Sequence, residues 1–65
     1  MVIAKVALDC PVDTLFDYRA TESLEIGQLV VVAFGKHRQV GLVFELSNQS
    51  SVAEARLRDV ERVLP

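Results

Sequence analysis

The sequence predicts an all-β domain: a small, partly open β-barrel of the OB-like kind, with at most one short helical turn. Two apolar segments rich in β-branched residues, 2–8 and 28–34, have the length and composition of buried strands. A third segment, 39–46, alternates between two faces as a strand does. Because a small sheet leaves its edges exposed unless it curls, we expect these strands to roll into a barrel.

Length and composition limit the chain to one small domain. It has 65 residues, of which 51% are hydrophobic, and a formal net charge of -2, so it is neither disordered nor long enough for two cores. Its longest apolar run, 29–34, is far shorter than the roughly 20 residues that span a bilayer. One cysteine excludes an internal disulfide and a cysteine-rich zinc site, and without a secretion signal we expect a cytoplasmic protein.

The charge is distributed unevenly along the chain. Residues 1–35 carry two basic and five acidic side chains, whereas residues 36–65 carry five basic and four acidic ones. Nucleic-acid-binding modules usually have a clear positive surplus. Any contact with nucleic acid is therefore expected to be short and local, not a long track of phosphates.

The first half of the chain predicts two strands joined by polar segments. The first strand, 2–8, ends before Pro11, which has no amide to donate to a neighbouring strand. The second lies within 12–20, where alternation places Phe16 and Tyr18 on one face and Asp17 on the other. A polar connection follows at 21–27, and we expect its two apolar residues, Leu24 and Ile26, to attach it to the core.

A hairpin is predicted next. The strand 28–34 contains three consecutive valines, which disfavour a helix, and the loop 35–38 begins with Gly35, which adopts a positive φ at little steric cost. The return strand 39–46 contains Gly41, and a glycine within a strand marks a bulge, a bend or a close backbone approach. In a small barrel we expect the bend.

The C-terminal segment fits two structures. After an exposed polar loop at 47–51, the apolar spacing in 52–64 fits one helical face, and Ser51 with Glu54 forms a capping-box pattern. The alternation in 57–64 also fits a short strand. From the pattern alone, the helix is favoured.

Residues that could support catalysis are few. His37 is the only histidine, and it is expected to be a solvated turn residue. Cys10 stands beside Asp9, which opposes formation of a thiolate. The aspartates at positions 9, 13 and 17 have helical spacing, but a proline breaks the helix that would bring them together. We therefore predict neither a catalytic nor a metal site.

The Phe16-Asp17-Tyr18 motif has two interpretations. In the first, both rings belong to the core and Asp17 is a solvated or turn-capping acid. In the second, a ring forms a stacking wall for a base, and Asp17 accepts a hydrogen bond from a sugar hydroxyl or a base amino group. A carboxylate repels phosphate, so such a site would prefer a strand end with a free hydroxyl.

The turn at 34–36 also has two interpretations: an ordinary hairpin turn, or part of a nucleic-acid-binding site. In the second interpretation Gly35 allows close approach of a ligand, and Lys36 or Arg38 neutralises a phosphate.

The ordered series of motifs resembles a known family. Val6-Ala7-Leu8, Phe16-Asp17-Tyr18, Val30-Val31-Val32, Phe34-Gly35-Lys36 and Gly41-Leu42-Val43 follow one another, with Gly27 ahead of the valines, as in the N-terminal 3′-end DNA-binding domain of the primosomal protein N′ (PriA) family of bacterial replication-restart helicases. The likeness continues through Leu57-Arg58 and residues 60–64. It implies a β-barrel-like module that recognises the 3′ end of the nascent leading strand at stalled or repaired forks.

The resemblance also implies which residues bind DNA. The terminal nucleotide would lie among Phe16, Asp17, Tyr18, Gly35 and Arg58, with Asp17 as the polar contact; Lys36 at the same turn completes the predicted site. Two positions depart from the family pattern: Ala33 stands where a proline is usual before Phe-Gly, and Arg58 where lysine is common. The second change matters only if the side chain makes the contact.

Further expectations follow for the whole protein. Residues 1–65 would be one DNA 3′-end-binding domain, the N-terminal fragment of a larger helicase. This domain would be no enzyme and would need no cofactor. The absent parts would hold ATP and zinc and act as an ATP-dependent 3′-to-5′ DNA helicase. Expected partners are a DNA 3′ end at a fork and, through the full-length protein, other primosome proteins, with no membrane contact.

The resemblance favours a closing strand near 58–64, with a single helical turn at 53–56 still possible. The alternative function is an SH3-like or partial-barrel protein-interaction module that binds no nucleic acid. Such a module would form oligomers, for example by exchange of a strand between copies. The acidic balance and the high apolar content, which could leave an edge or patch exposed, support this alternative.

Overall fold

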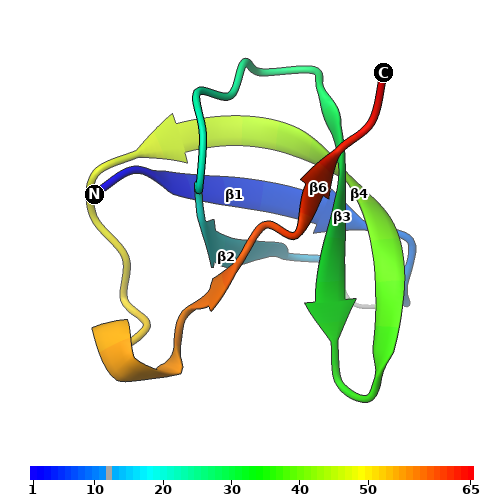
Figure 1. Ribbon diagram of the computed structural model, residues 1–65. Helices are drawn as coiled ribbons and strands as arrows, with labels where there is room; N and C mark the ends of the chain where they lie inside the picture. Colours follow the sequence, from blue (N-terminus) through cyan, green and yellow to red (C-terminus); the bar gives the residue numbers. More distant parts are fainter. Residues whose placement is uncertain (12) are drawn as a thin grey trace.

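The computed structural model describes residues 1–11 and 13–65, which form one curled six-stranded sheet and one short 3-10 turn (Figure 1). The sheet order is β5-β2-β1-β4-β3-β6. The elements are β1 (Ile3–Leu8), β2 (Leu15–Arg19), β3 (Leu29–Phe34), β4 (His37–Ser47), η1 (Glu54–Arg56), β5 (Arg58–Asp59) and β6 (Arg62–Val63). The predicted all-β class, a partly open barrel with one helical turn, is confirmed.

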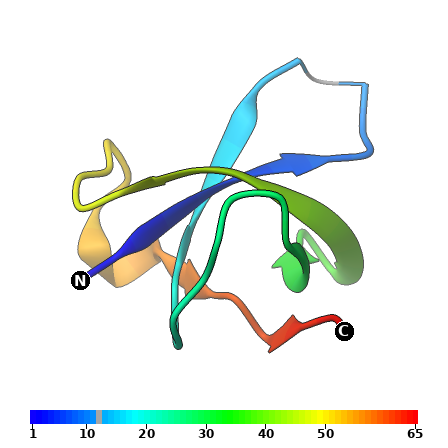
Figure 2. The same cartoon turned by 90° about the horizontal axis from the view of Figure 1, so that it is seen from above.

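Antiparallel pairing of β1 with both β2 and β4 forms the centre of the sheet. The hairpin partner of β4 is β3, so the first four strands pair in the order β2-β1-β4-β3. Figure 2 shows the long β4 curving across β1, which brings β3 round toward β2. This curvature gives the sheet an enclosed face on which a core can form.

The segment 58–63, here called the closing segment, partly closes the barrel by pairing with both of its open edges. β5 runs parallel to β2, with Arg58 opposite Tyr18, and β6 runs antiparallel to β3. Between them, Val60 N donates to Arg19 O and Glu61 N donates to Val31 O, each at 2.9 Å. The strand implied by the family resemblance is confirmed as two short strands, and the helical turn is the three-residue η1.

The helix favoured by the pattern in 52–64 is wrong, and so is the capping box. The residue that precedes η1 is Ala53, with no side-chain hydrogen bond at the cap, and Leu57 leaves the turn with extended backbone. Leu57 and Val60 are nevertheless buried. Because both face inward from an extended segment, their helical spacing reflects burial in the barrel and not a helix.

The connection between β2 and β3 is attached differently from the prediction. Leu24 is buried at 8% exposure, as expected, whereas Ile26 is 66% exposed and does not anchor the segment. The backbone does so instead: Gly27 N donates to Val43 O at 2.8 Å, and Val43 N donates to Gln28 O at 2.9 Å. These bonds fix the loop against β4 and leave Ile26 outside.

The hairpin loop between β3 and β4 is two residues long, shorter than the predicted 35–38. Phe34 pairs with His37, so only Gly35 and Lys36 form the turn. Gly35 has φ 61°, whereas no residue other than glycine has a positive φ in the described chain. A positive φ at the first turn position alone is the pattern of a type II′ turn, whose twist suits a hairpin.

Gly41 is a point of close approach, not a bulge. It faces Leu8 of β1 and Val30 of β3, and a β-carbon there would run into the side chains of Val6 and Leu8. The register shift between β1 and β4 lies elsewhere, between Lys5 and Val6. The glycine therefore allows three strands to pack closely where the sheet curls.

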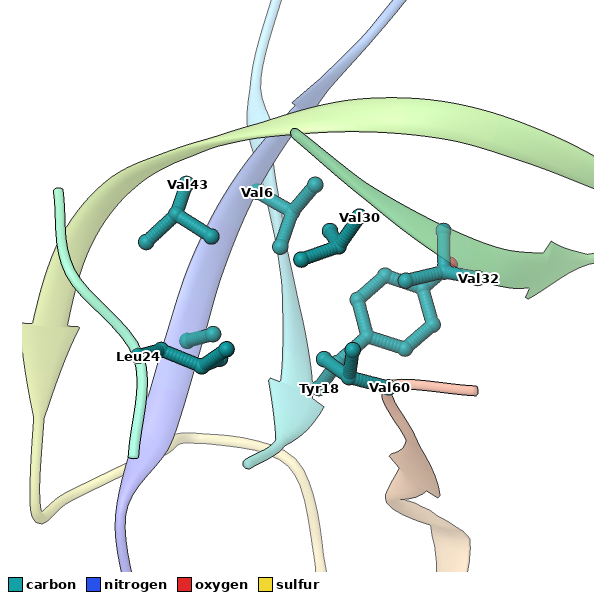
Figure 3. Packing of buried hydrophobic residues seen from close by; sticks show 8 residues of the cluster. Val6, Tyr18, Leu24, Val30, Val32, Val43 and Val60 are labelled. Atoms are coloured by element: carbon teal, nitrogen blue, oxygen red, sulfur yellow. The ribbon is translucent and has the colours of Figure 1, made fainter. Parts of the chain in front are cut away.

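The core is small and consists largely of valine. Its buried residues come from β1 to β4, from the β2–β3 connection and from the segment between β5 and β6: Ala4, Val6, Tyr18, Leu24, Val30, Val32, Val43 and Val60. Figure 3 shows the ring of Tyr18 next to Val32 and Val60, which joins β2, β3 and the closing segment. β-branched residues suit this core because they pack well on pleated strands.

No helix in the described residues is long and apolar enough to cross a membrane. The same residues contain no group of three or more His, Cys, Asp or Glu side chains that could hold a metal ion.

Candidate nucleic-acid interface

A hollow of about 230 Å³ lies where β2, the β3–β4 turn and the start of the closing segment meet. Its lining is Phe16, Asp17, Tyr18, Ala33, Phe34, Gly35, Val52, Arg56 and Arg58. Five of the six predicted site residues thus lie around one opening, although they come from three distant segments of the sequence. The sixth, Lys36, occupies the second position of the same turn and does not line the hollow.

Aromatic rings form the apolar part of the hollow. Phe16 and Phe34 meet edge to face, with ring centroids 4.9 Å apart and planes at 70°. Phe16 stands opposite Val6 in the register, and its ring packs against the core, which supports it on the side away from the hollow's opening. An edge-to-face pair of this kind is a rigid apolar surface on which another flat ring can stack.

Tyr18 joins the hollow to the core. Its ring is buried, and its hydroxyl donates to Ala33 O at 2.7 Å, a bond that connects β2 to β3 across the barrel. Burial raises the pKa of Tyr18 above 10.0, although the nearby Arg58 charge partly opposes this shift. The phenol therefore stays protonated near neutral pH and retains the proton that it donates.

Asp17 points to the other face of β2, as the alternation predicts, and its carboxylate is held by this chain's own residues. Lys5, directly opposite in the register, donates from Nζ to Oδ1 at 3.1 Å and to Oδ2 at 3.3 Å. Ser50 Oγ also donates to Oδ2. The Asp17 side chain is 10% exposed. Its predicted contact with a nucleotide would have to share oxygens that already accept these bonds.

The backbone of β2 offers a second way for Asp17 to contact a ligand. Val60 N donates to Arg19 O, so the peptide groups of Arg19 point toward β5. Peptide groups alternate along a strand, and those of Asp17 therefore point to the same edge. Because Tyr18 pairs with Arg58, the Asp17 carbonyl belongs to the β2–β5 ladder, and the Asp17 N–H is the peptide group that lies beyond it.

Two arginines line the opening, and a third holds the turn that carries one of them. Arg58 is exposed and donates from Nη1 to Gly35 O at 3.3 Å, which connects the closing segment to the β3–β4 turn. Arg19 donates to Leu57 O at 2.9 Å and to Glu54 O at 3.4 Å, and thereby holds η1 against β2. Because η1 includes Arg56, this contact also places a second cationic side chain beside the hollow.

Sequence reasoning missed part of this lining. Val52 and Arg56 belong to a segment for which the pattern favours a helix, and Ser50, which bonds to Asp17 beside the hollow, lies in the polar loop predicted at 47–51. The basic charge concentrated at 56–62 was the one signal that could have identified Arg56. The bond between Ser50 and Asp17 joins residues 33 positions apart, and no local pattern indicates it.

Comparison with known proteins places the chain in a family. Residues 5–65 match the family model described as the 3′ DNA-binding domain (3′BD) of PriA. The chain is also 39% identical over 62 residues to the replication restart protein PriA of Haemophilus influenzae. That alignment covers 92% of this chain but 8% of the relative, so the chain spans a small part of the relative's length. The chain belongs to the PriA 3′ DNA-binding domain family.

Proposed function

We propose that this domain binds the 3′ end of a DNA strand and holds the terminal nucleotide in the hollow between β2, the β3–β4 turn and Arg58. The observation that carries the proposal is the meeting of Phe16, Asp17, Tyr18, Gly35 and Arg58 around one opening. Membership in a family described as a 3′ DNA-binding domain supports it.

The size and chemistry of the hollow favour one nucleotide. At about 230 Å³ it is smaller than the roughly 300–1,000 Å³ of typical small-molecule sites, so it suits one base or sugar better than a length of strand. A base can stack on the Phe16–Phe34 surface, a contact that contributes about 1–3 kcal/mol. The edge of β2 at Asp17 provides hydrogen-bonding groups for that base, and the arginines attract the adjoining phosphate.

This arrangement favours a free 3′ hydroxyl. A 3′ phosphate is much larger than a hydroxyl, and a hollow of about 230 Å³ that holds a base or sugar leaves little room for it. The Asp17 carboxylate lies on the other face of β2 and is paired with Lys5, so its charge does not decide this preference.

The biological role that we propose is targeting. As part of a larger replication-restart helicase, the domain would direct that protein to the 3′ end of the nascent leading strand at stalled or repaired forks. ATP hydrolysis, a zinc site and contacts with other primosome proteins would belong to the remainder of the protein. The 8% share of the PriA relative that the chain covers supports this division.

A binding titration tests the proposal. Short single-stranded oligonucleotides of one sequence, with either a free 3′ hydroxyl or a 3′ phosphate, are titrated with the domain and followed by fluorescence anisotropy. We expect the free end to bind about tenfold more tightly, because the small hollow has little room for a 3′ phosphate. Equal dissociation constants would remove the claim of end recognition.

A matched pair of arginine variants locates the site. Arg58→Ala removes a charge that lines the hollow, whereas Arg62→Ala removes the same charge from β6, outside the lining. We expect Arg58→Ala to weaken binding of the free 3′ end about tenfold and Arg62→Ala to have a much smaller effect. Equal losses in the two variants would show that only net charge matters.

The alternative function, a protein-interaction module that forms oligomers, is favoured by one observation. Leu29, Leu42, Ala7 and Leu15 are successive register partners across four strands, and Leu29 and Leu42 are exposed. Sedimentation at several concentrations distinguishes the two functions. A tight oligomer that does not bind single-stranded DNA would contradict the proposed DNA binding and support this alternative.

A further inference from the structure

A chain of hydrogen bonds connects β1 and β2 to the loop 48–53 between β4 and η1. Lys5 Nζ donates to both carboxylate oxygens of Asp17, and Ser50 Oγ donates to Oδ2 of the same carboxylate. Ser50 Oγ in turn accepts a hydrogen bond from Val52 N at 3.0 Å. Asp17 is therefore the point through which two strands hold this loop.

The loop matters because of what Val52 does. Val52 lines the hollow proposed to hold the terminal nucleotide, and it also lines a neighbouring hollow of about 430 Å³. Phe16 and Asp17 are likewise shared by the two hollows. Val52 thus stands at the boundary between them, 39% exposed, and is the apolar side chain that the loop contributes to both.

The burial of the network makes it suited to holding the loop. The side chains of Lys5 and Asp17 are 24% and 10% exposed, so solvent screens this pair less than it screens a surface pair. Leaving either charge without its partner is unfavourable, because a partly buried charge needs hydrogen bonds. The hydroxyl of Ser50 meets part of that need for Asp17, so the loop and the ion pair stabilise each other.

We propose that Lys5, Asp17 and Ser50 are positioning residues that hold Val52 as the outer wall of the nucleotide hollow. This inference rests on the proposed function and deepens it. Asp17 then acts on DNA through the loop and through the shape of the hollow, and its carboxylate does not touch the nucleotide. The acid is present because it accepts from Lys5 and Ser50 together, which a neutral residue cannot do as well.

A direct contact between the carboxylate and DNA makes a different prediction. If the carboxylate itself bound the nucleotide, Asp17→Asn would weaken binding and Ser50→Ala would not. If the carboxylate acts by holding the loop, both variants release Val52 and should give similar losses. Changes in one connected network are also non-additive, so the double variant should lose no more than the worse single variant.

The experiment measures the dissociation constants of the free 3′ hydroxyl and 3′ phosphate oligonucleotides for wild type, Asp17→Asn, Ser50→Ala and the double variant. We expect each single variant to weaken binding of the free end by about three- to tenfold and to reduce its preference over the phosphate. Ser50→Thr keeps the hydroxyl and should restore binding. Wild-type affinity in Ser50→Ala would overturn the inference, as would additive losses in the double variant.

Ser47→Ala is the matched control. Ser47 Oγ accepts from Gln49 N at 3.1 Å, the same local bond that Ser50 makes with Val52, but it lines neither of the two hollows. It should bind DNA as wild type does. Thermal unfolding of every variant shows whether a loss of binding is merely a loss of folding, and the rescue by Ser50→Thr checks this independently.

Amide hydrogen exchange tests the network without DNA. Val52 N–H should exchange faster in Ser50→Ala and Asp17→Asn than in wild type, because its acceptor is lost or released. Unchanged exchange would overturn the inference even if binding fell. If wild type showed no preference for a free end but Val52 exchange accelerated as expected, the proposed function would fail while the network remained.

Discussion

Tyr18 shows how one side chain serves both the core and the candidate site. Its ring packs with the buried valines, its hydroxyl bonds to Ala33 O, and its outer side lines the hollow next to Arg58. Binding of a nucleotide in the hollow would therefore change the environment of Tyr18, the residue that links β2 to β3. As the chain contains one tyrosine and no tryptophan, the ultraviolet signals of Tyr18 report on this position alone.

The raised pKa of Tyr18 makes stability depend on pH in the alkaline range. Burial keeps the phenol protonated to a higher pH in the folded domain than in the unfolded chain, where the pKa is 10.0. Between those two pKa values the unfolded state binds fewer protons, so the free energy of unfolding falls as pH rises above about 10 and is unaffected by this group at lower pH.

Tyr18→Phe should remove that part of the pH dependence and cost about 1 kcal/mol near neutral pH through the lost hydrogen bond. Urea unfolding of both proteins at a series of pH values from neutral to about 11 makes the comparison. Parallel decreases in the two proteins above pH 10 would contradict the assignment.

At the residue scale, local alternation was enough to place Phe16 and Tyr18 on one face and Asp17 on the other, because side chains in a strand alternate whatever else surrounds it. The partners of Asp17 were beyond the sequence. Lys5 is its neighbour only through the β1–β2 register, and Ser50 only through the path of a loop. The proposed role of Asp17 depends on these long-range partners.

At the element scale, two glycines have different physical roles, and substitution separates them. Gly35 has φ 61° with open space around it, so alanine there meets only backbone strain, about 1–2 kcal/mol. Gly41 has ordinary backbone but no room, since a β-carbon would run into the side chains of the fully buried Val6 and of Leu8. We expect Gly41→Ala to destabilise the domain by about 1–3 kcal/mol or more.

Urea unfolding of the two alanine variants measures this difference. Gly41→Ala should have the lower midpoint, because relief requires β1 to move away from β4. A Gly41→Ala protein as stable as wild type would mean that the strands approach less closely than described here.

The strands were predicted to different degrees. The apolar, β-branched runs of β1 and β3 could be recognised directly, since few other structures bury such segments. The segment 52–64 could not, because the spacing of its apolar residues, Leu57 and Val60 among them, favours a helical face although its structure is extended. What decides its structure is pairing with β2 and β3, which lie far away in the sequence. The family resemblance, not the pattern, indicated the strand.

At the scale of the whole molecule, the charge distribution predicts a weak dependence of DNA binding on salt. Among the described residues, Lys5, Arg19 and Arg38 lie in ion pairs with Asp17, Asp59 and Glu61, so part of the basic charge is already matched. A site for one terminal nucleotide contacts one or two phosphates, each of which contributes about -0.7 to the slope of log K against log salt.

We therefore expect a slope of about -0.7 to -1.4 for a short single-stranded oligonucleotide, measured by anisotropy at several salt concentrations. A slope steeper than about -3 would indicate a longer phosphate track and contradict the single-nucleotide site.

Membership in the family could be predicted because several weak motifs occur in a specific order, although none of them is decisive alone. The hollow itself could not be predicted, since it forms only where a hairpin turn, one strand and the closing segment meet. The two departures from the family pattern, Ala33 and Arg58, both lie in its lining. Arg58 contacts the backbone of the turn at Gly35, so the change from lysine bears on the shape of the rim.

Recognition of a strand end can be measured with a strand that has no end. A linear oligonucleotide with a free 3′ hydroxyl and its ligated circular copy have the same sequence and nearly the same charge. We expect the linear form to compete for the domain and the circle to compete at least about tenfold less well. Equal competition by the circle would show that the domain does not recognise the end.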